Sequence, residues 1–176
     1  MFTRDDAFPH TPPPHESVGG GWIDKQQGGK AIKIVKTGWT VSPEFTIHLH
    51  GRDIKLLFLI QSQFGSGTIR RTKSDESILF SVKSLADITN KIIPHFDKYP
   101  LLTQKRADFL LFKRVIELMN KKEHLTTVGL HEIVSIRAAM NNGLTELLIK
   151  SFPSITPVQR PLVEELEITQ LVSWFH

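Results

Sequence analysis

The apolar residues of this chain follow two different periods, and the shorter period identifies strands. In residues 41–50, Phe45, Ile47 and Leu49 alternate with polar residues, which is the pattern of a strand buried on one face. Residues 77–83 alternate in the same way. The pattern predicts four strands, in two pairs that are each joined by a short turn: 30–36 with 41–50, and 68–73 with 77–83.

Helical periods fill most of the remaining chain. Asp53 is expected to cap a helix that ends at the glycines of 65–67, and the Tyr99-Pro100 pair is expected to end a second helix. Further apolar periods predict three more helices: over 103–123, up to Asn-Asn-Gly 141–143, and up to Pro153.

The order of these elements is strand–strand–helix–strand–strand–helix, followed by three helices. It predicts an α+β fold in which a four-stranded antiparallel sheet carries helices on one face. We expect an irregular leader in residues 1–29, the folded domain in 30–152, and a linker in 153–176.

The other face of the sheet is predicted to be polar. Alternation points hydroxyl, imidazole and cationic side chains away from the helices: Thr46, His48, Arg70, Thr72, Ser81 and Lys83. Such side chains donate to phosphates and hydrogen-bond to base edges, and an antiparallel ribbon fits the major groove of DNA. The alternative interpretation is an ordinary solvated sheet face.

Two cations occupy an unfavourable place in the predicted helix that begins near Thr103. Lys105 and Arg106 fall in its first turn, where the partial positive charge of the helix N-terminus disfavours them. A bound phosphate would satisfy the backbone amides and both side chains together. Alternatively, both side chains extend into water.

The charge distribution favours a polyanionic partner. The 176 residues carry a net charge of +4, but residues 30–124 hold 17 Lys and Arg against 9 Asp and Glu. The central segment therefore has a net charge of +8, and both ends are acidic. The chain contains no cysteine, which excludes disulfides and thiolate chemistry. No apolar run is long enough to span a membrane, and the N-terminus resembles neither a secretory signal nor a transit peptide.

Several segments, in order along the chain, closely resemble the LAGLIDADG homing endonucleases. They read "FTIHLHGRDIKLLFLIQSQFGSGTI", "IIPHFDKYPLLTQKRADFLLFKRVIELMNKK" and "FPSITPVQRP". The similarity covers about residues 30–162 and is to the N-terminal half of the two-repeat members encoded in fungal mitochondrial introns. The resemblance implies a saddle-shaped sheet that lies in the DNA major groove, cleavage of double-stranded DNA with Mg²⁺, and a mitochondrial location.

The motif that names this family departs from its pattern here. The family pattern ends a helix with an acidic residue that binds the metal, whereas this chain reads "GWIDKQQGG" over residues 21–29 and has Gln26 at that position. Hard Mg²⁺ prefers anionic oxygen, so a neutral amide is a poor ligand. Asp24 is the weak remaining candidate for a catalytic or metal-binding acid. We expect the first motif helix to be lost, the second repeat to be absent, and cleavage to be impaired.

Three alternatives remain open. The chain could be a non-catalytic splicing cofactor (a maturase) that binds intron RNA, or the product of a decaying gene that barely folds. A second repeat or another chain could supply the missing motif helix.

His48 and His50 lie two residues apart on one strand face and could chelate a metal, but no third ligand is apparent.

Overall fold

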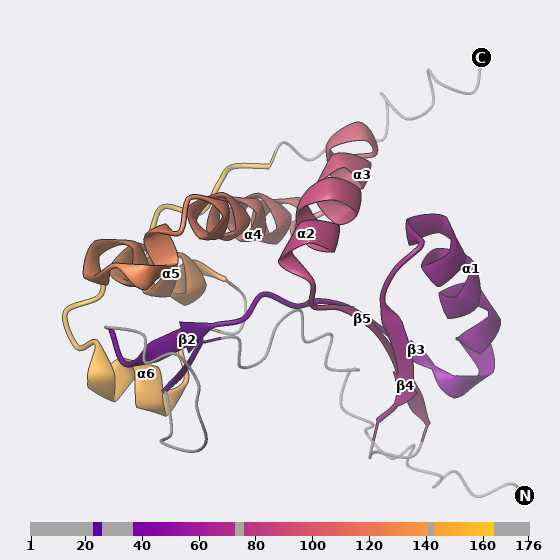
Figure 1. Cartoon of the computed structure of the whole chain (residues 1–176), viewed down its shortest axis with the longest axis horizontal. Coiled ribbons are helices and arrows are strands. Elements are labelled where there is room, and N and C mark those ends of the chain that lie inside the picture. Colours follow the sequence, from indigo (N-terminus) through magenta and orange to yellow (C-terminus); the bar gives the residue numbers. More distant parts are fainter. Residues whose placement is uncertain (1–22, 26–36, 73–75, 141–142, 164–176) are drawn as a thin grey trace, which may run out of the picture.

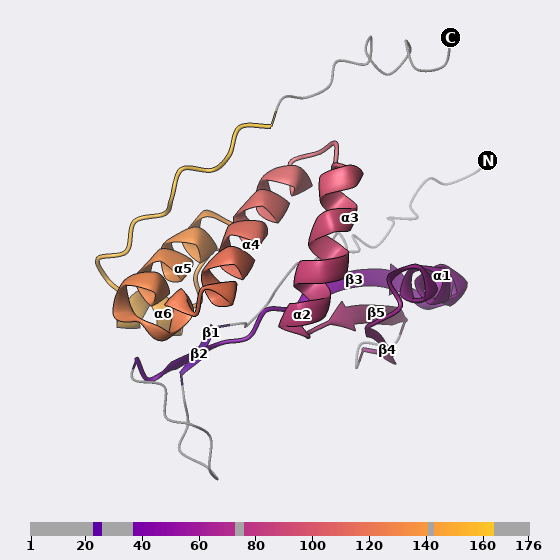
Figure 2. The same ribbon diagram turned by 45° about the horizontal axis from the view of Figure 1, so that its top comes forward.

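The computed structural model describes residues 23–25, 37–72, 76–140 and 143–163. Its elements form a sheet with one helix at one end of the molecule and a group of helices at the other (Figure 1). A pair of helices in the middle joins the two ends, as the turned view shows (Figure 2).

The main sheet consists of antiparallel strands in the order β3-β5-β4. Strand β3 spans Phe45–His50, β4 spans Thr68–Arg71 and β5 spans Ser77–Val82. These strands confirm the mixed α+β class, and the predicted pairing of 68–73 with 77–83 is observed as β4 with β5. The predicted strand 30–36 lies outside the described residues, so the described part of this sheet has three strands.

The predicted strand 41–50 is divided in two, which is a correction. Strand β2 (Trp39–Val41) pairs antiparallel with β1 (Ile23–Lys25) in a separate two-stranded sheet, and β3 begins only at Phe45. Pro43 lies between them and has no backbone N–H for a ladder. Trp39, which was expected in a turn, is buried in β2 and packs against Phe152 with ring centroids 5.3 Å apart.

Helix α1 spans Ile54–Phe64 after a 3-10 turn over Gly51–Asp53. The prediction that Asp53 caps this helix is wrong, because its side chain makes no cap hydrogen bond. The predicted end is confirmed, since Gly65 adopts the left-handed conformation with φ 57° and its N–H donates to the Gln61 carbonyl.

The helical run from Leu85 to Lys98 contains α2 (Leu85–Asp87), a π-helical turn (Ile88–Ile92) and α3 (Ile93–Lys98). The Ser84 hydroxyl caps it by accepting a hydrogen bond from the Asp87 N–H at 3.2 Å. The π turn comes just before Pro94, which lacks the N–H that a regular helix would use.

Helices α1 and α3 cover the same face of the main sheet. The Phe45 ring of β3 lies 6.4 Å from Phe64 of α1 and 5.7 Å from Phe96 of α3, measured between centroids. Phe80 of the central strand β5 is fully buried and stacks on Phe64 at 6.3 Å. The expected packing of helices on one face of the sheet is therefore observed for these elements.

The remaining helices are α4 (Lys105–Asn120), α5 (Thr127–Ala139) and α6 (Glu146–Ser151), with a 3-10 turn over Glu123–Leu125. Helices α4 and α5 supply much of the core, including Val115, Ile133 and Ile136, which are fully buried. In the described part of the chain, no helix has the length and apolar character needed to cross a bilayer.

The described part of the predicted linker, residues 153–163, is here called the C-terminal strap. It runs back over the helices (Figure 2), and the Val158 N–H donates to the Ser135 carbonyl of α5 at 3.2 Å. Ile155 and Val158 pack against the core. Residues 164–176 lie outside the described part.

Candidate nucleic-acid interface

The strand register arranges the outward side chains of the main sheet in rows. Residues that pair directly across antiparallel strands project from the same face. Thr46 pairs with Ser81 and Ser81 with Thr68, so one row carries hydroxyls from three strands. The next row contains His48, Leu79 and Arg70.

The hydroxyls of this face are joined in pairs across the strands. Thr68 Oγ1 lies 3.3 Å from Ser81 Oγ, and Thr72 Oγ1 lies 2.7 Å from Ser77 Oγ. Ser81 is only 3% exposed, whereas Thr68 is exposed. Thr68 is therefore the most exposed of the three hydroxyl residues in this row, Thr46 is half-buried and Ser81 is buried.

Two exposed cations of this face share one carboxylate. Glu44 precedes β3, and its Oε1 lies 3.6 Å from Lys83 Nζ and 4.0 Å from a terminal nitrogen of Arg70. The side chains of Arg70 and Lys83 are 59% and 63% exposed, but that of Glu44 is only 22% exposed. Both cations can therefore reach a ligand that approaches the sheet.

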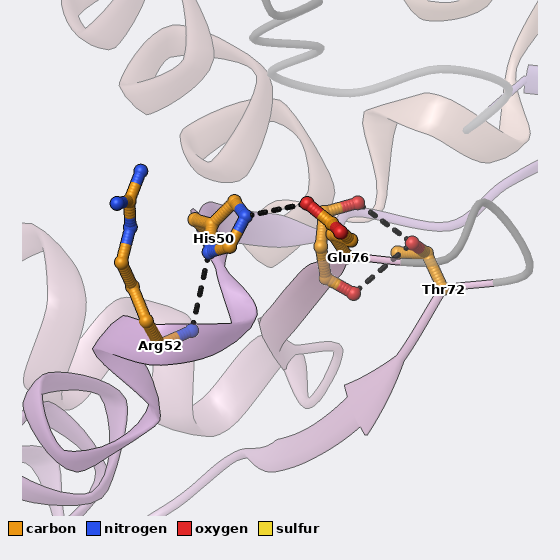
Figure 3. Close-up of polar contacts among 5 residues, drawn as sticks. His50, Arg52, Thr72 and Glu76 are labelled. Carbon is orange, nitrogen blue, oxygen red and sulfur yellow. Dashed lines mark hydrogen bonds and ion pairs between the residues drawn. The ribbon is translucent and has the colours of Figure 1, made fainter.

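His50 closes the end of the sheet, where β3 runs into α1. Figure 3 shows its ring between the Arg52 backbone and the Glu76 carboxylate. The Arg52 N–H donates to Nδ1 at 3.2 Å, so the ring proton sits on Nε2, which donates to Glu76 Oε2 at 2.8 Å. Both ring nitrogens of His50 are thus engaged, and this geometry does not suit chelation with His48.

Lys105 and Arg106 lie in the first turn of α4, as predicted. Thr103 Oγ1 accepts a hydrogen bond from the Lys105 N–H at 3.2 Å, and the Thr103 carbonyl accepts one from the Arg106 N–H at 2.8 Å. Arg106 is exposed. Lys105 lines an apolar groove of about 330 Å³ between β3 and helices α3 and α4, together with Phe96, Phe109 and Phe112. Glu44, Thr46 and His48 line the same groove, whereas Arg70 and Lys83 do not.

The candidate acids of the degenerate motif receive no structural support. Asp24 belongs to β1, where only the backbone is described, and Gln26 lies outside the described residues. Within the described ranges, no three His, Asp or Glu side chains gather in a way that could hold a metal ion. The described side chains therefore include no set of oxygen ligands of the kind that Mg²⁺ needs.

Sequence reasoning missed Glu76 and Arg52 at this surface. Alternation places Glu44 on the polar face, but it does not predict that Glu44 lies near both Arg70 and Lys83. The pairing of His50 with Glu76 joins residues 26 positions apart, and no local pattern marks it.

The sequence matches a known protein family. Residues 19–116, more than half of the chain, match the model of the LAGLIDADG endonucleases. This chain belongs to the LAGLIDADG endonuclease family. The recognition made from the sequence motifs is thereby confirmed.

Fungal relatives carry names that agree with this assignment. The chain is 44% identical over 132 residues to "Probable intron-encoded endonuclease 3" of Neurospora crassa, covering 74% of this chain. It is 41% identical over 139 residues to "Probable intron-encoded endonuclease 2" of the same fungus, covering 78% of this chain. The matched regions amount to 25% and 31% of those two proteins.

Solved LAGLIDADG meganucleases share the fold of this chain. The I-SmaMI structure with an uncleaved DNA target and calcium ions superposes with a TM-score of 0.75 at 38% identity, covering 83% of this chain and 48% of I-SmaMI. I-CpaMI bound to uncleaved DNA gives a TM-score of 0.68 at 40% identity, covering 72% of this chain and 43% of that one. This chain therefore spans less than half of either meganuclease.

Proposed function

We propose that this chain binds duplex DNA through the outward face of its main sheet. The observation that carries the proposal is the placement of Arg70 and Lys83, exposed on the face opposite α1 and α3. Thr46, His48, Thr68 and Thr72 add groups that hydrogen-bond to base edges. The net charge of +8 in residues 30–124 and the DNA-bound state of the related meganucleases support the same partner.

Lys105 and Arg106 are proposed to contact the DNA backbone. They place two cations at the N-terminus of α4, where the helix dipole favours an anion such as a phosphate. Phosphate contacts position a protein on DNA without reading its sequence. These two residues are therefore proposed to contribute to affinity, and the sheet face to selectivity between sequences.

Cleavage by this chain is proposed to be weak. The family resemblance implies hydrolysis of phosphodiesters with Mg²⁺, in which the metal activates water and stabilises the leaving oxygen. Gln26 offers a neutral oxygen where the family pattern has a carboxylate, and Asp24 is the weak alternative acid. A mitochondrial location is proposed from the resemblance and from the intron-encoded fungal relatives.

The proposal is tested by titrating purified chain into labelled duplex DNA of mixed sequence, with single-stranded and hairpin RNA as competitors. We expect a complex with the duplex at low ionic strength that competing RNA displaces poorly, because the polar ribbon fits a DNA major groove and not the deep, narrow major groove of RNA. The same samples with added Mg²⁺ or Mn²⁺ should show no efficient double-strand cutting. Preferential displacement by RNA would favour the splicing cofactor, and efficient cutting would refute impaired cleavage.

A further inference from the structure

An acidic side chain lies on the face that the proposed function assigns to DNA. Glu44 immediately precedes β3, and extending the register beyond the Phe45–Val82 pair places it opposite Lys83. A carboxylate there would repel phosphates. Its side chain is also much less exposed than those of Arg70 and Lys83.

The burial of Glu44 is most complete at one of its carboxylate oxygens. Glu44 Oε1 exposes less than 1 Å² and has no hydrogen-bond partner among the described residues. Its charged neighbours are instead Lys83 Nζ at 3.6 Å and Arg70 at 4.0 Å. These separations are too long for good hydrogen bonds, so the carboxylate attracts both cations through space without clamping either one.

We propose that Glu44 is a specificity-determining residue that competes with DNA phosphates for Arg70 and Lys83. The inference rests on the proposed DNA-binding function. In the free protein, the carboxylate partly neutralises the two cations and keeps both side chains over the sheet. Glu44 itself is a positioning residue, because it acts through the side chains of Arg70 and Lys83.

The competition weakens nonspecific contacts more than specific ones. A phosphate that binds Arg70 or Lys83 takes the place of the Glu44 carboxylate as the anionic partner. The net gain in binding free energy is therefore small. A guanine that accepts two hydrogen bonds from the Arg70 guanidinium adds directional bonds that a through-space contact with Glu44 does not provide. Glu44 therefore lowers affinity for arbitrary DNA and raises discrimination between sequences.

The test compares Glu44→Gln with the unchanged protein on a mixed-sequence duplex over a series of salt concentrations. Removing the carboxylate should release the cations to phosphates, so nonspecific binding tightens and the slope of log K against log salt steepens by about 0.9 for each cation released. Selection from a randomised duplex library should yield a less enriched consensus with the variant.

Glu132→Gln is the matched control, because it removes the same charge from an ion pair on the helices. Glu132 lies 2.6 Å from Arg114 and is 31% exposed, which is comparable to Glu44. The slope of log K against log salt for Glu132→Gln should stay near that of the unchanged protein. Equal steepening in both variants would mean a general effect of net charge and would overturn the role of Glu44. An unchanged slope and consensus in Glu44→Gln would overturn it too.

A folding defect in Glu44→Gln would be detected by its thermal transition. In that case Glu44→Asp provides the test, because it keeps the charge but withdraws it by one methylene from both cations. Its slope should steepen by less than that expected of Glu44→Gln, and a slope equal to or shallower than that of the unchanged protein would contradict the inference. Failure of the unchanged protein to bind duplex DNA at all would instead count against the proposed function.

Discussion

Two glycines that follow α1 show how single positions hold the sheet against its helices. Gly65 has φ 57° and Gly67 has φ 94°, so both adopt conformations that side chains disfavour. A Cβ on Gly65 would meet nothing within 4 Å, whereas a Cβ on Gly67 would lie 2.4 Å from the buried Phe80 ring. Gly67 is therefore required by packing as well as by backbone conformation.

Replacing Gly67 with alanine should lower the free energy of unfolding by about 2–4 kcal/mol, because backbone strain adds to a clash in the core. Gly65→Ala is the control, since it carries similar backbone strain without the clash and should cost about 1 kcal/mol. Urea unfolding of both variants measures the difference. An equal loss of unfolding free energy in the two variants would show that the Phe80 ring moves aside without cost and would contradict the prediction.

For single residues, the sequence predicted which face of the sheet a side chain points to, but not which side chains it contacts. Phe45, Phe80 and Thr46 lie on the expected faces because alternation follows from strand geometry alone. The contact between Glu44 and Arg70 also needs the order β3-β5-β4, which no local pattern contains. Ser81 was assigned to the DNA-facing set by alternation, but neighbouring side chains bury it.

Among the elements, helices were predicted more accurately than strands. The helix predicted over 103–123 is observed as Lys105–Asn120, and its apolar stripe was long enough to be distinctive. The prediction of a single strand over 41–50 is wrong, because the strand is interrupted around Pro43. Residues 45–50 alternate regularly, and this regular pattern did not reveal the interruption before them. The C-terminal strap was predicted only as a linker, because the contacts of Val158 and Arg160 that hold it reach residues far away in the sequence.

Arg160 joins the C-terminal strap to both α4 and α5. Its guanidinium lies 2.8 Å from Asp108 Oδ1 and donates to the carbonyls of Ala139 at 3.0 Å and Gln104 at 3.2 Å. Asp108 is only 4% exposed, and Arg137 is buried nearby. Burial lowers the pKa of Arg137, and the Asp108 carboxylate opposes that shift.

Arg160→Met should destabilise the protein by about 2–4 kcal/mol, because it removes a cation from a buried carboxylate and leaves two carbonyls without their donor. Lys150→Met is the control: Lys150 lies 4.0 Å from Glu146 in an exposed pair, and its loss should cost less than about 0.5 kcal/mol. Thermal or urea unfolding compares the two. A similar small effect in both variants would show that the strap contributes little to stability.

For the molecule as a whole, the arrangement of layers determines what the protein can bind. Helices α1 and α3 occupy one face of the main sheet, which leaves the face with Arg70 and Lys83 on the other side. The α+β class and the polar face followed from the sequence because they depend on element order and alternation. The charge of +8 in residues 30–124 indicates a polyanion but does not identify the surface that meets it.

The most direct test of this account removes the same number of charges from two faces. Arg70→Ala/Lys83→Ala changes the sheet face, and Lys113→Ala/Arg114→Ala changes the helices, where both cations are also ion-paired. Binding to a mixed-sequence duplex is measured over a series of salt concentrations. The account predicts that the sheet variant loses most of its affinity and has a shallower salt slope, partly because Glu44 is left uncompensated, while the helix variant changes little. Equal losses in both variants, or a loss confined to the helix variant, would contradict DNA binding by the sheet.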